Sequence, residues 1–174
     1  LSELSYKITK NKPKNLIAVT GTNGKSSIAD FYFQLLNLSN KKVASIGTLG
    51  IRTKNNLKNV SNTTLDPIGL SKILNDLKKQ RIDHVMLEAS SHGLKQNRLD
   101  GLKFNTAIFT NLSHDHLDYH NTFSDYLKSK LYLFESLLKS RGNIITDSKI
   151  PEYKNLKKIS LNSKFNLQVL SKSN

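Results

Sequence analysis

Short apolar runs alternate along the chain with longer segments of helical periodicity. The runs are rich in β-branched residues and predict buried strands at 15–20, 42–48, 84–90, 104–112 and 142–147. Apolar residues at helical spacing predict helices at 26–38, 66–80 and 122–139. In the second of these helices, Asp66 is expected as the N-cap and Pro67 as the first helical residue. Strands that alternate with helices predict an α/β fold with a doubly wound, mostly parallel sheet.

The two ends of the chain carry weaker patterns. Residues 1–14 are polar and basic, with Pro13 just before the first apolar run, and they predict a linker or a frayed end. Residues 150–174 alternate short apolar runs with Lys and Asn and predict no clear closing element. The length of 174 residues is that of about one domain with a core of its own.

The composition excludes several classes of site. The chain has no cysteine, which rules out disulfides and thiolate metal sites. No apolar run approaches the ~18 residues that a membrane span requires, and the first residues lack the apolar stretch of a signal peptide. We therefore expect a cytoplasmic protein without a membrane partner.

The net charge of +14 indicates an anionic partner or a lysine-rich genome composition. The lysines are scattered and lack interleaved aromatic residues, so a nucleic-acid partner is not expected. The alternative is a basic P-loop ATPase that binds nucleic acid, whose affinity would fall steeply with salt.

Polar residues gather after the predicted strands, where ligands bind in such sheets. The segment "VTGTNGKSSIADF" supplies a strand, a glycine-containing loop, a lysine, a hydroxyl and a helix, which are the parts of a phosphate-binding loop. Val19 takes the position of the usual first glycine and lies inside the strand, so the loop is of a short form. The alternative is a strand-to-helix turn without a ligand. The candidate phosphate-binding residues are Gly21, Thr22, Asn23, Gly24, Lys25, Ser26 and Ser27.

Three further segments carry polar candidates. Glu88 ends a buried strand, where a Mg²⁺ ligand would face the loop, and the serines after it could bind or only cap. The amide and hydroxyl groups of 62–64 precede Asp66 and could equally serve as caps. Gln96 and Arg98 project together if the chain is extended, and Arg98 could hold a carboxylate or phosphate or be surface charge.

The segment "FTNLSHDHLDYHNTF" concentrates three histidines and two aspartates. A zinc site formed by His114, His116 and His120 is one interpretation. The other is that one histidine and a carboxylate serve a second Mg²⁺ beside the phosphate loop. We expect His114, and His120 less firmly, to be polar surface.

The segments "GTNGKSS", "NTTLDP", "EASSHGLKQNR" and "FTNLSHDHLDYH" occur in an order that resembles the ATP-binding central domain of the Mur ligase family. The resemblance covers about residues 15–140, and "SSHGL" and "DHLDYH" favour the MurE type over its siblings and over folylpolyglutamate synthase, which remains an alternative. It implies the cofactors ATP and Mg²⁺ and an amide ligase that joins UDP-MurNAc-L-Ala-D-Glu to a diamino acid, either diaminopimelate or lysine. A monomer is expected.

The family has three domains, and the resemblance implies that this chain holds one of them. Residues 1–14 would be a linker or the end of a missing N-terminal domain. Residues 15–174 would be the central domain, incomplete at its C-terminal end, and the C-terminal amino-acid-binding domain would be absent. Such a piece is expected to be inactive alone.

The resemblance also implies individual roles. Residues 21–27 and Asn111 would bind the nucleotide, with Lys25 on the outer phosphates and Ser26 on Mg²⁺. Glu88 and His116 would be metal ligands, and Lys130 a carbamate that orients Mg²⁺, with Lys128 as the alternative. The residues matched to muramoyl-dipeptide contacts are Asn62, Thr63, Thr64, Ser90, Gln96 and Arg98.

The chain also departs from the family pattern. Leu65 stands where proline is common, His114 where arginine is common and Asn121 where glycine is common. Ser26 and Ser27 replace threonines and keep the hydroxyl, whereas His114 removes a permanent cation. By its local pattern alone, Lys130 would be a solvated helix lysine.

Overall fold

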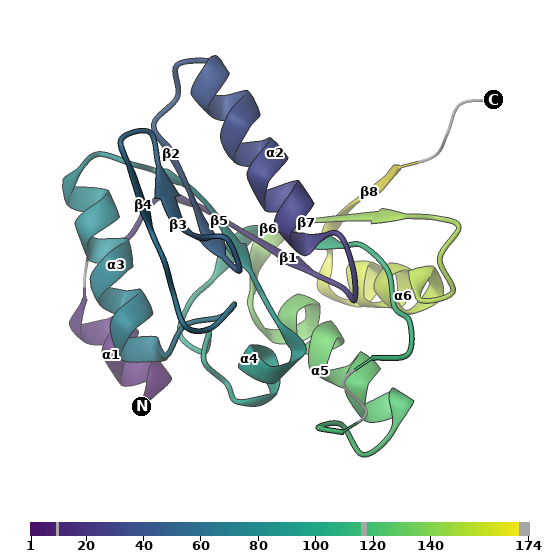
Figure 1. Cartoon of the computed structure of the whole chain (residues 1–174). Helices are drawn as coiled ribbons and strands as arrows, with labels where there is room; N and C mark the ends of the chain where they lie inside the picture. The colour runs from purple at the N-terminus through teal and green to yellow at the C-terminus, as the bar shows by residue number, and fades with distance from the viewer. Residues whose placement is uncertain (10, 116–117, 171–174) are drawn as a thin grey trace.

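The computed structural model describes residues 1–9, 11–115 and 118–170 (Figure 1). The helices are α1 Ser2–Ile8, α2 Lys25–Leu38, α3 Pro67–Lys79, α4 Ser91–Lys95, α5 Phe123–Ser136 and α6 Tyr153–Ser163. The strands are β1 Asn15–Thr20, β2 Val43–Gly47, β3 Gly50–Thr53, β4 Asn56–Lys58, β5 His84–Glu88, β6 Phe104–Phe109, β7 Leu138–Asp147 and β8 Asn166–Leu170.

One sheet organises the described residues, in the strand order β4-β3-β2-β5-β1-β6-β7-β8. Strands β2, β5, β1, β6, β7 and β8 pair in parallel, and β3 and β4 extend the sheet as antiparallel strands at one edge. The prediction of a doubly wound, mostly parallel α/β sheet is confirmed. Because β1 lies between β5 and β6, the carboxyl ends of these three strands meet at the middle of one edge.

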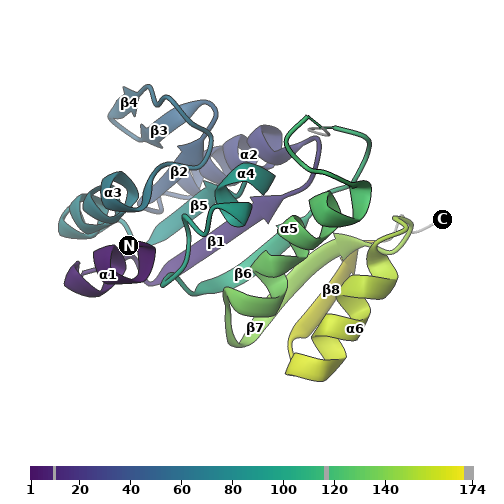
Figure 2. The same ribbon diagram turned by 90° about the horizontal axis from the view of Figure 1, so that it is seen from below.

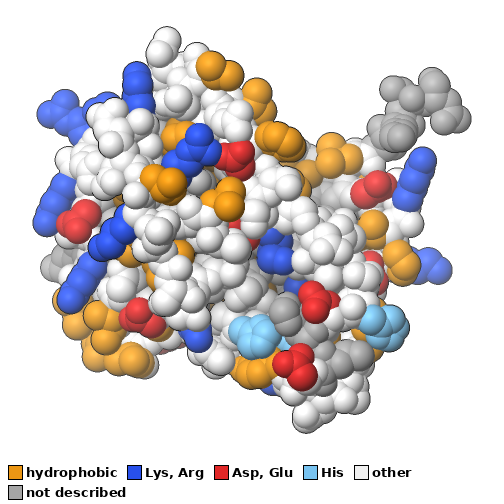
Figure 3. Space-filling view, in the orientation of Figure 1, with side chains coloured by type: hydrophobic (Ala, Val, Ile, Leu, Met, Phe, Trp, Pro, Cys, Tyr) orange, Lys and Arg blue, Asp and Glu red, His pale blue; other side chains and the backbone are white. Residues whose placement is uncertain are grey.

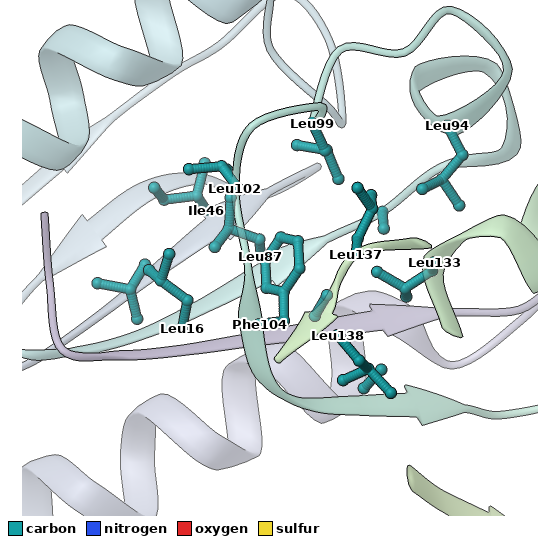
Figure 4. Packing of buried hydrophobic residues seen from close by; sticks show 14 of the residues in the cluster. Leu16, Ile46, Leu87, Leu94, Leu99, Leu102, Phe104, Leu133, Leu137 and Leu138 are labelled. Atoms are coloured by element: carbon teal, nitrogen blue, oxygen red, sulfur yellow. The ribbon is translucent and has the colours of Figure 1, made fainter. Parts of the chain in front are cut away.

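Helices cover both faces of this sheet (Figures 1 and 2). Helix α2 packs on β1, β2 and β5 over a small cluster that contains Val19, Ala29 and Met86. The larger core lies beneath the other helices, where leucines from strands, loops and α5 pack around Phe104 (Figure 4). Strands in the middle of such a sheet are covered on both faces, which explains why all of β2 and all of β5 after His84 are buried.

The capping signals of the sequence are met in α3. The side chain of Asp66 accepts a hydrogen bond from the backbone N–H of Gly69, and Pro67 is the first helical residue. The helix buries Leu70, Leu74 and Leu77, which repeat at helical spacing. The predicted helix at 66–80 is therefore confirmed.

The N-terminal prediction of a frayed or linking segment is wrong for residues 2–8, which form α1. The apolar side chains of Leu1, Leu4 and Ile8 are exposed, so the helix has no apolar stripe toward the core that a pattern could reveal. It is held instead by Tyr6, which is 1% exposed and whose hydroxyl donates to the carbonyl of Arg98 at 2.9 Å, and by Ser71 of α3, whose hydroxyl donates to the carbonyl of Ser5 at 2.9 Å.

The prediction that residues 150–174 lack a closing element is also wrong. Helix α6 buries Leu156 and Ser160, and β8 pairs in parallel with β7. The strand is largely exposed, which gives it no apolar signature. The β3–β4 hairpin was not predicted for the same reason, because all three residues of β4 are exposed.

Within the described residues, no helix has the length and apolar character that crossing a bilayer would require.

Replacing Tyr6 with alanine tests whether α1 is part of the folded domain. Loss of a fully buried aromatic side chain and its hydrogen bond should lower the free energy of unfolding by about 3 kcal/mol or more. The exposed neighbour in Leu4→Ala should change it by less than about 0.5 kcal/mol. Urea denaturation measures both, and equal stabilities of the two variants would show that α1 does not contribute to the fold.

Candidate active site

The phosphate-binding loop lies between the end of β1 at Thr20 and the start of α2 at Lys25. Its N-cap, Gly24, has a left-handed backbone with φ of 84° and offers no side-chain cap to the helix. The first turn of α2 contains no acidic residue. The N–H groups of that turn therefore remain available to an anion, which the helix dipole also attracts.

The segment that follows β6 holds this loop in place. The backbone N–H of Thr22 donates to the carbonyl of Asn111 at 2.9 Å, and that of Asn23 donates to Asn111 Oδ1 at 2.9 Å. A Cβ on Gly21 would lie 1.8 Å from Thr110 Oγ1, and Gly21 has a φ of +144°. Only glycine fits this approach of the two segments. Asn111, predicted to bind nucleotide, lies behind the loop and positions it.

Two lysines meet at the carbonyl of Gly21. Lys25 Nζ donates to it at 3.0 Å and to the carbonyl of Thr22 at 2.8 Å, and Lys130 Nζ donates to the Gly21 carbonyl at 2.8 Å. Lys130 is 1% exposed, so its description as a solvated helix lysine is wrong, whereas Lys128 is exposed. Burial, reinforced by the charge of Lys25, lowers the pKa of Lys130 to about 7.

Glu88 is a buried carboxylate beside the loop, 2% exposed at the end of β5. Its Oε2 accepts hydrogen bonds from Ser26 Oγ at 2.9 Å and Thr48 Oγ1 at 3.1 Å, and its Oε1 accepts from the N–H of Thr48 at 3.0 Å. A Cβ on Gly47 would lie 2.1 Å from Glu88 Oε1, so glycine at this position makes room for the carboxylate.

This oxygen-rich arrangement fits a magnesium ion. The hydroxyl of Ser26 and the carboxylate of Glu88 are adjacent, and both are ligand types that Mg²⁺ prefers. No group of three or more His, Asp or Glu residues converges among the residues described. His116, predicted as a metal ligand and as part of the zinc alternative, lies outside the described residues.

The other predicted polar residues form a second wall of the site. Thr64 Oγ1 donates to the backbone carbonyl of Glu88 at 2.9 Å and lies 3.0 Å from Ser90 Oγ, which in turn accepts from the N–H of Gly93 and so caps α4. Arg98 Nη1 donates to the carbonyl of Thr64 at 2.6 Å. Gln96 and Arg98 follow α4 in a turn rather than an extended segment, yet Arg98 Nε donates to Gln96 Oε1 at 2.8 Å.

A cleft of about 510 Å³ lies between these walls. Most predicted phosphate and substrate residues line it together, as do two residues that were not predicted and Ser91, which the sequence left open as a binding or a capping residue. The predicted residues in the lining are Thr22, Asn23, Gly24, Lys25, Ser26, Ser27, Asn62, Thr63, Thr64, Ser90, Gln96, Arg98 and Lys130. The others are Thr48, Ser91 and His92. Thr48 follows the carboxyl end of β2, so the rule that located the other clusters would have found it.

The described histidines of the segment 109–123 have different environments. His114 is exposed as expected, and its ring centroid lies 5.0 Å from that of Phe123. The expectation of polar surface is wrong for His120, which is 0% exposed and packs against the rings of Tyr119 and Tyr126. Tyr126 connects this packing to the loop, because its hydroxyl lies 3.1 Å from Thr22 Oγ1.

Comparison with known proteins gives consistent relatives. The chain is 47% identical over 150 residues to the UDP-N-acetylmuramoyl-L-alanyl-D-glutamate--2,6-diaminopimelate ligase of Rickettsia bellii, covering 84% of this chain and 32% of that protein. The namesake ligase of Rickettsia felis is 52% identical over 127 residues, covering 71% of this chain and 24% of that protein. The chain thus spans about a third or less of the length of these relatives.

Solved structures agree with the fold. A structure of UDP-N-acetylmuramoyl-L-alanyl-D-glutamate--2,6-diaminopimelate ligase superposes with a TM-score of 0.82 at 34% identity, over 97% of this chain and 34% of that chain. E. coli FolC in complex with DHPP and ADP superposes with a TM-score of 0.72 at 17% identity, over 97% of this chain and 45% of that chain. The second likeness shows a shared fold alone.

The Mur ligase middle domain, as a family, matches residues 19–174. This match includes the phosphate-binding loop, both walls of the cleft and the closing elements α6 and β8. The chain therefore belongs to the Mur ligase family.

Proposed function

We propose that this chain is the ATP-binding part of an ATP-dependent amide ligase that acts in peptidoglycan precursor synthesis. The reaction joins diaminopimelate or lysine to UDP-MurNAc-L-Ala-D-Glu. The observation that carries the proposal is that the phosphate-binding loop and the wall formed by Thr64, Ser90 and Arg98 line the same cleft. The names of the relatives support this substrate.

The proposed reaction has two steps. The side-chain carboxylate of D-Glu attacks the γ-phosphate of ATP, which forms an acyl phosphate and releases ADP. The amine of the incoming amino acid then attacks the acyl carbon and releases phosphate, so that an amide remains. Positioning and charge neutralisation are the main contributions of a protein to such chemistry.

The loop supplies the positive charge. The ammonium group of Lys25, now hydrogen-bonded to the carbonyls of Gly21 and Thr22, would turn to the outer phosphates of bound ATP. The N–H groups at the start of α2 would bind the phosphate oxygens. Ser26 and Glu88, with His116, would hold Mg²⁺, which neutralises phosphate charge when bound.

The opposite wall would orient the acceptor. The guanidinium of Arg98 is held by the carbonyl of Thr64 and the side chain of Gln96, which restricts its orientation in the cleft. Such a fixed guanidinium suits a carboxylate or phosphate of the muramoyl dipeptide. The hydroxyl of Ser90 would donate to a neighbouring oxygen of the same substrate, and Thr64, whose hydroxyl donates to the carbonyl of Glu88, would hold Ser90 in place.

Lys130 is proposed to act as a carbamate. Its amine nitrogen would form a bond to the carbon of CO₂ and lose a proton, which gives a carboxylate at the end of the side chain. Burial beside the Gly21 carbonyl supports Lys130 over the exposed Lys128. The resulting anion would lie next to Lys25 and help to orient Mg²⁺.

We also propose that the parent protein is a cytoplasmic monomer and that this chain does not turn over alone. The parent should release phosphate from Mg-ATP only when UDP-MurNAc-L-Ala-D-Glu and one of the two diamino acids are present. If the parent binds ATP but releases no phosphate with either diamino acid, the proposed substrate UDP-MurNAc-L-Ala-D-Glu is wrong. A folate is then the next substrate to test.

Replacing Lys25 with alanine in the parent should lower kcat by about 10²-fold or more, because a cation that faces the transferring phosphate is lost. Lys149→Ala, a change of an exposed lysine away from the cleft lining, should leave kcat unchanged. Steady-state phosphate release measures both. Near-normal turnover of Lys25→Ala would contradict the assignment of residues 21–27 as the phosphate-binding loop.

Glu88→Gln keeps the shape of the side chain and removes its charge. In this chain, the dependence of ATP affinity on Mg²⁺ should weaken by at least about tenfold, because a metal ligand is lost. Titration calorimetry with and without Mg²⁺ measures the effect. The control, Glu135→Gln, changes an exposed carboxylate on α5 and should behave as the wild type. An unaltered Mg²⁺ dependence in Glu88→Gln would argue against this metal site.

Carbamylation can be observed directly. The chain incubated with ¹³C-labelled bicarbonate should give a carbamate carbon resonance in its NMR spectrum. The resonance should disappear in Lys130→Met and persist in Lys128→Met. Loss of the resonance in Lys128→Met alone would transfer the role to Lys128, and the absence of any resonance in the wild type would contradict carbamylation of this chain.

A further inference from the structure

The edge of the sheet opposite the cleft is lined with cations. Each parallel strand begins at this edge, here called the amino edge, and a basic residue precedes the strand or lies in its first half. These residues are Lys14 before β1, Lys41 and Lys42 before β2, Arg81 before β5, Lys103 before β6, Lys139 and Arg141 in β7 and Lys164 before β8. All are exposed except Lys139, which is half-buried.

Strand register places these residues side by side. Val43 pairs with His84, and His84 pairs with Asn15. The residues just before them are Lys42, Asp83 and Lys14. They therefore lie next to one another on neighbouring strands, about 4.8 Å apart. Further along the row, Lys139 Nζ donates to the carbonyl of Lys14 at 3.3 Å. The cations thus lie along this edge on both sides of Asp83, which precedes β5 between Lys42 and Lys14.

The one carboxylate at the centre of this row is already paired. Asp83 Oδ1 accepts from Lys78 Nζ at 2.6 Å and from the backbone N–H of Lys14 at 3.0 Å. These hydrogen bonds, that from Lys78 first, lower the pKa of Asp83. Asp83 therefore compensates mainly Lys78 and in part Lys14, and the basic residues of the row outnumber it.

Seven acidic residues lie toward the other edge of the sheet, although the described lining of the cleft itself holds Lys25, Arg98 and Lys130 and no carboxylate. The seven are Asp66, Glu88, Asp115, Asp118, Asp125, Asp147 and Glu152, which follow strands or begin helices. In Figure 3, Lys and Arg side chains dominate the left margin beside α3 and β4, whereas acidic and histidine side chains gather at the lower right, near the start of α5. The excess of basic residues at the amino edge would orient the domain at a negatively charged surface.

A pocket of about 310 Å³ lies at one end of the amino edge. It is formed by the end of α2, the start of β2 and the β3–β4 turn. Its residues are Asn37, Asn40, Lys41, Lys42, Val43, Thr53, Lys54, Asn55, Gln80 and Ile82, with no acidic residue in this described lining. Lysine and amide side chains are donors suited to phosphate oxygens.

The carbonyls at the end of α2 would repel an anion, but two of them are already engaged. The N–H of Lys41 donates to the carbonyl of Leu36 at 2.9 Å, and the N–H of Asn40 donates to that of Asn37 at 3.0 Å. The C-terminal end of α2, where the helix dipole is negative, is thus capped by the chain itself. Lys41, Lys42 and Lys54 then line the pocket beside it.

We propose that the amino edge is a docking surface for an anionic lipid bilayer, and that the pocket takes the phosphate of one headgroup. Juxtaposed lysines attract such surfaces at short range without inserting into them. Docking in this way leaves the carboxyl ends of the strands, and the cleft beside them, facing water. A contact of this kind is made at the bilayer surface and therefore needs no apolar run in the chain.

The chemistry of the edge favours lipid over nucleic acid. Lysine outnumbers arginine, whose planar group is the usual choice for nucleic acid. Single-stranded nucleic acid also needs aromatic stacking surfaces. The exposed phenylalanines of the described residues are elsewhere, Phe31 in the middle of α2 and Phe123 at the start of α5.

Vesicle sedimentation of this 174-residue chain tests the proposal. The chain should sediment with phosphatidylcholine vesicles that contain about one third phosphatidylglycerol and not with phosphatidylcholine alone, and high salt should release it. Equal sedimentation with both vesicle types, or binding to duplex DNA without binding to vesicles at the same salt, would overturn the proposal.

Matched variants separate the amino edge from net charge. Lys41→Gln, Lys42→Gln and Lys54→Gln combined should reduce binding to the anionic vesicles by about 10- to 100-fold. The control combines Lys154→Gln, Lys157→Gln and Lys158→Gln, which removes the same charge from exposed positions of α6 and should change binding within about twofold. Circular dichroism verifies that both variants are folded. Equal losses in the two variants would show that only net charge matters and would contradict the assigned surface.

Discussion

The buried carboxylate of Glu88 is the group on which the cleft depends. Its Oε2 accepts from Ser26 at the start of α2, and both its oxygens accept from Thr48 after β2. Its backbone carbonyl accepts from Thr64 on the opposite wall. One residue thus joins the phosphate-binding loop, the neighbouring strand and the proposed substrate wall. A buried charge is costly unless it is hydrogen-bonded or paired, so these contacts and a metal ion would both stabilise it.

The order of the strands explains why these groups meet. Since β1 lies between β5 and β6, the loop after β1 is bordered by Glu88 on one side and by Thr110 and Asn111 on the other. Both neighbours contact the loop through short polar side chains. The turns that enter the parallel strands are also rich in basic residues, with Asp83 among them. The proposed bilayer contact and the proposed ligase site would therefore occupy opposite edges of one sheet.

Much of this was predictable from sequence because the informative residues form local patterns. Buried strands have long apolar runs, and Asp66 with Pro67 marks a helix start that depends on neighbouring residues alone. The phosphate-binding loop and the polar clusters after the strands are likewise read from short segments. Because ligands bind at the carboxyl ends of parallel strands, these segments could be predicted from the sequence to share one site, and most of them line the cleft.

What the sequence could not reveal depends on tertiary packing. Helix α1 exposes its leucines and is fixed by the buried Tyr6 and by a hydrogen bond from Ser71, so its apolar pattern gives no sign of the face that packs on the domain. The burial of Lys130 depends on the distant loop at Gly21, whose carbonyl accepts its hydrogen bond. His120 is likewise buried by aromatic rings of its own segment and of α5. Strand β8 pairs through its backbone while its side chains stay exposed, which leaves no apolar signal.

A crystal structure of this chain with Mg²⁺ and a non-hydrolysable ATP analogue tests the central claim most directly. The account predicts that the phosphates lie against the backbone N–H groups of residues 21–27, with the metal ion bound between Ser26 and Glu88. A nucleotide bound elsewhere, or a metal ion that contacts neither side chain, would contradict it.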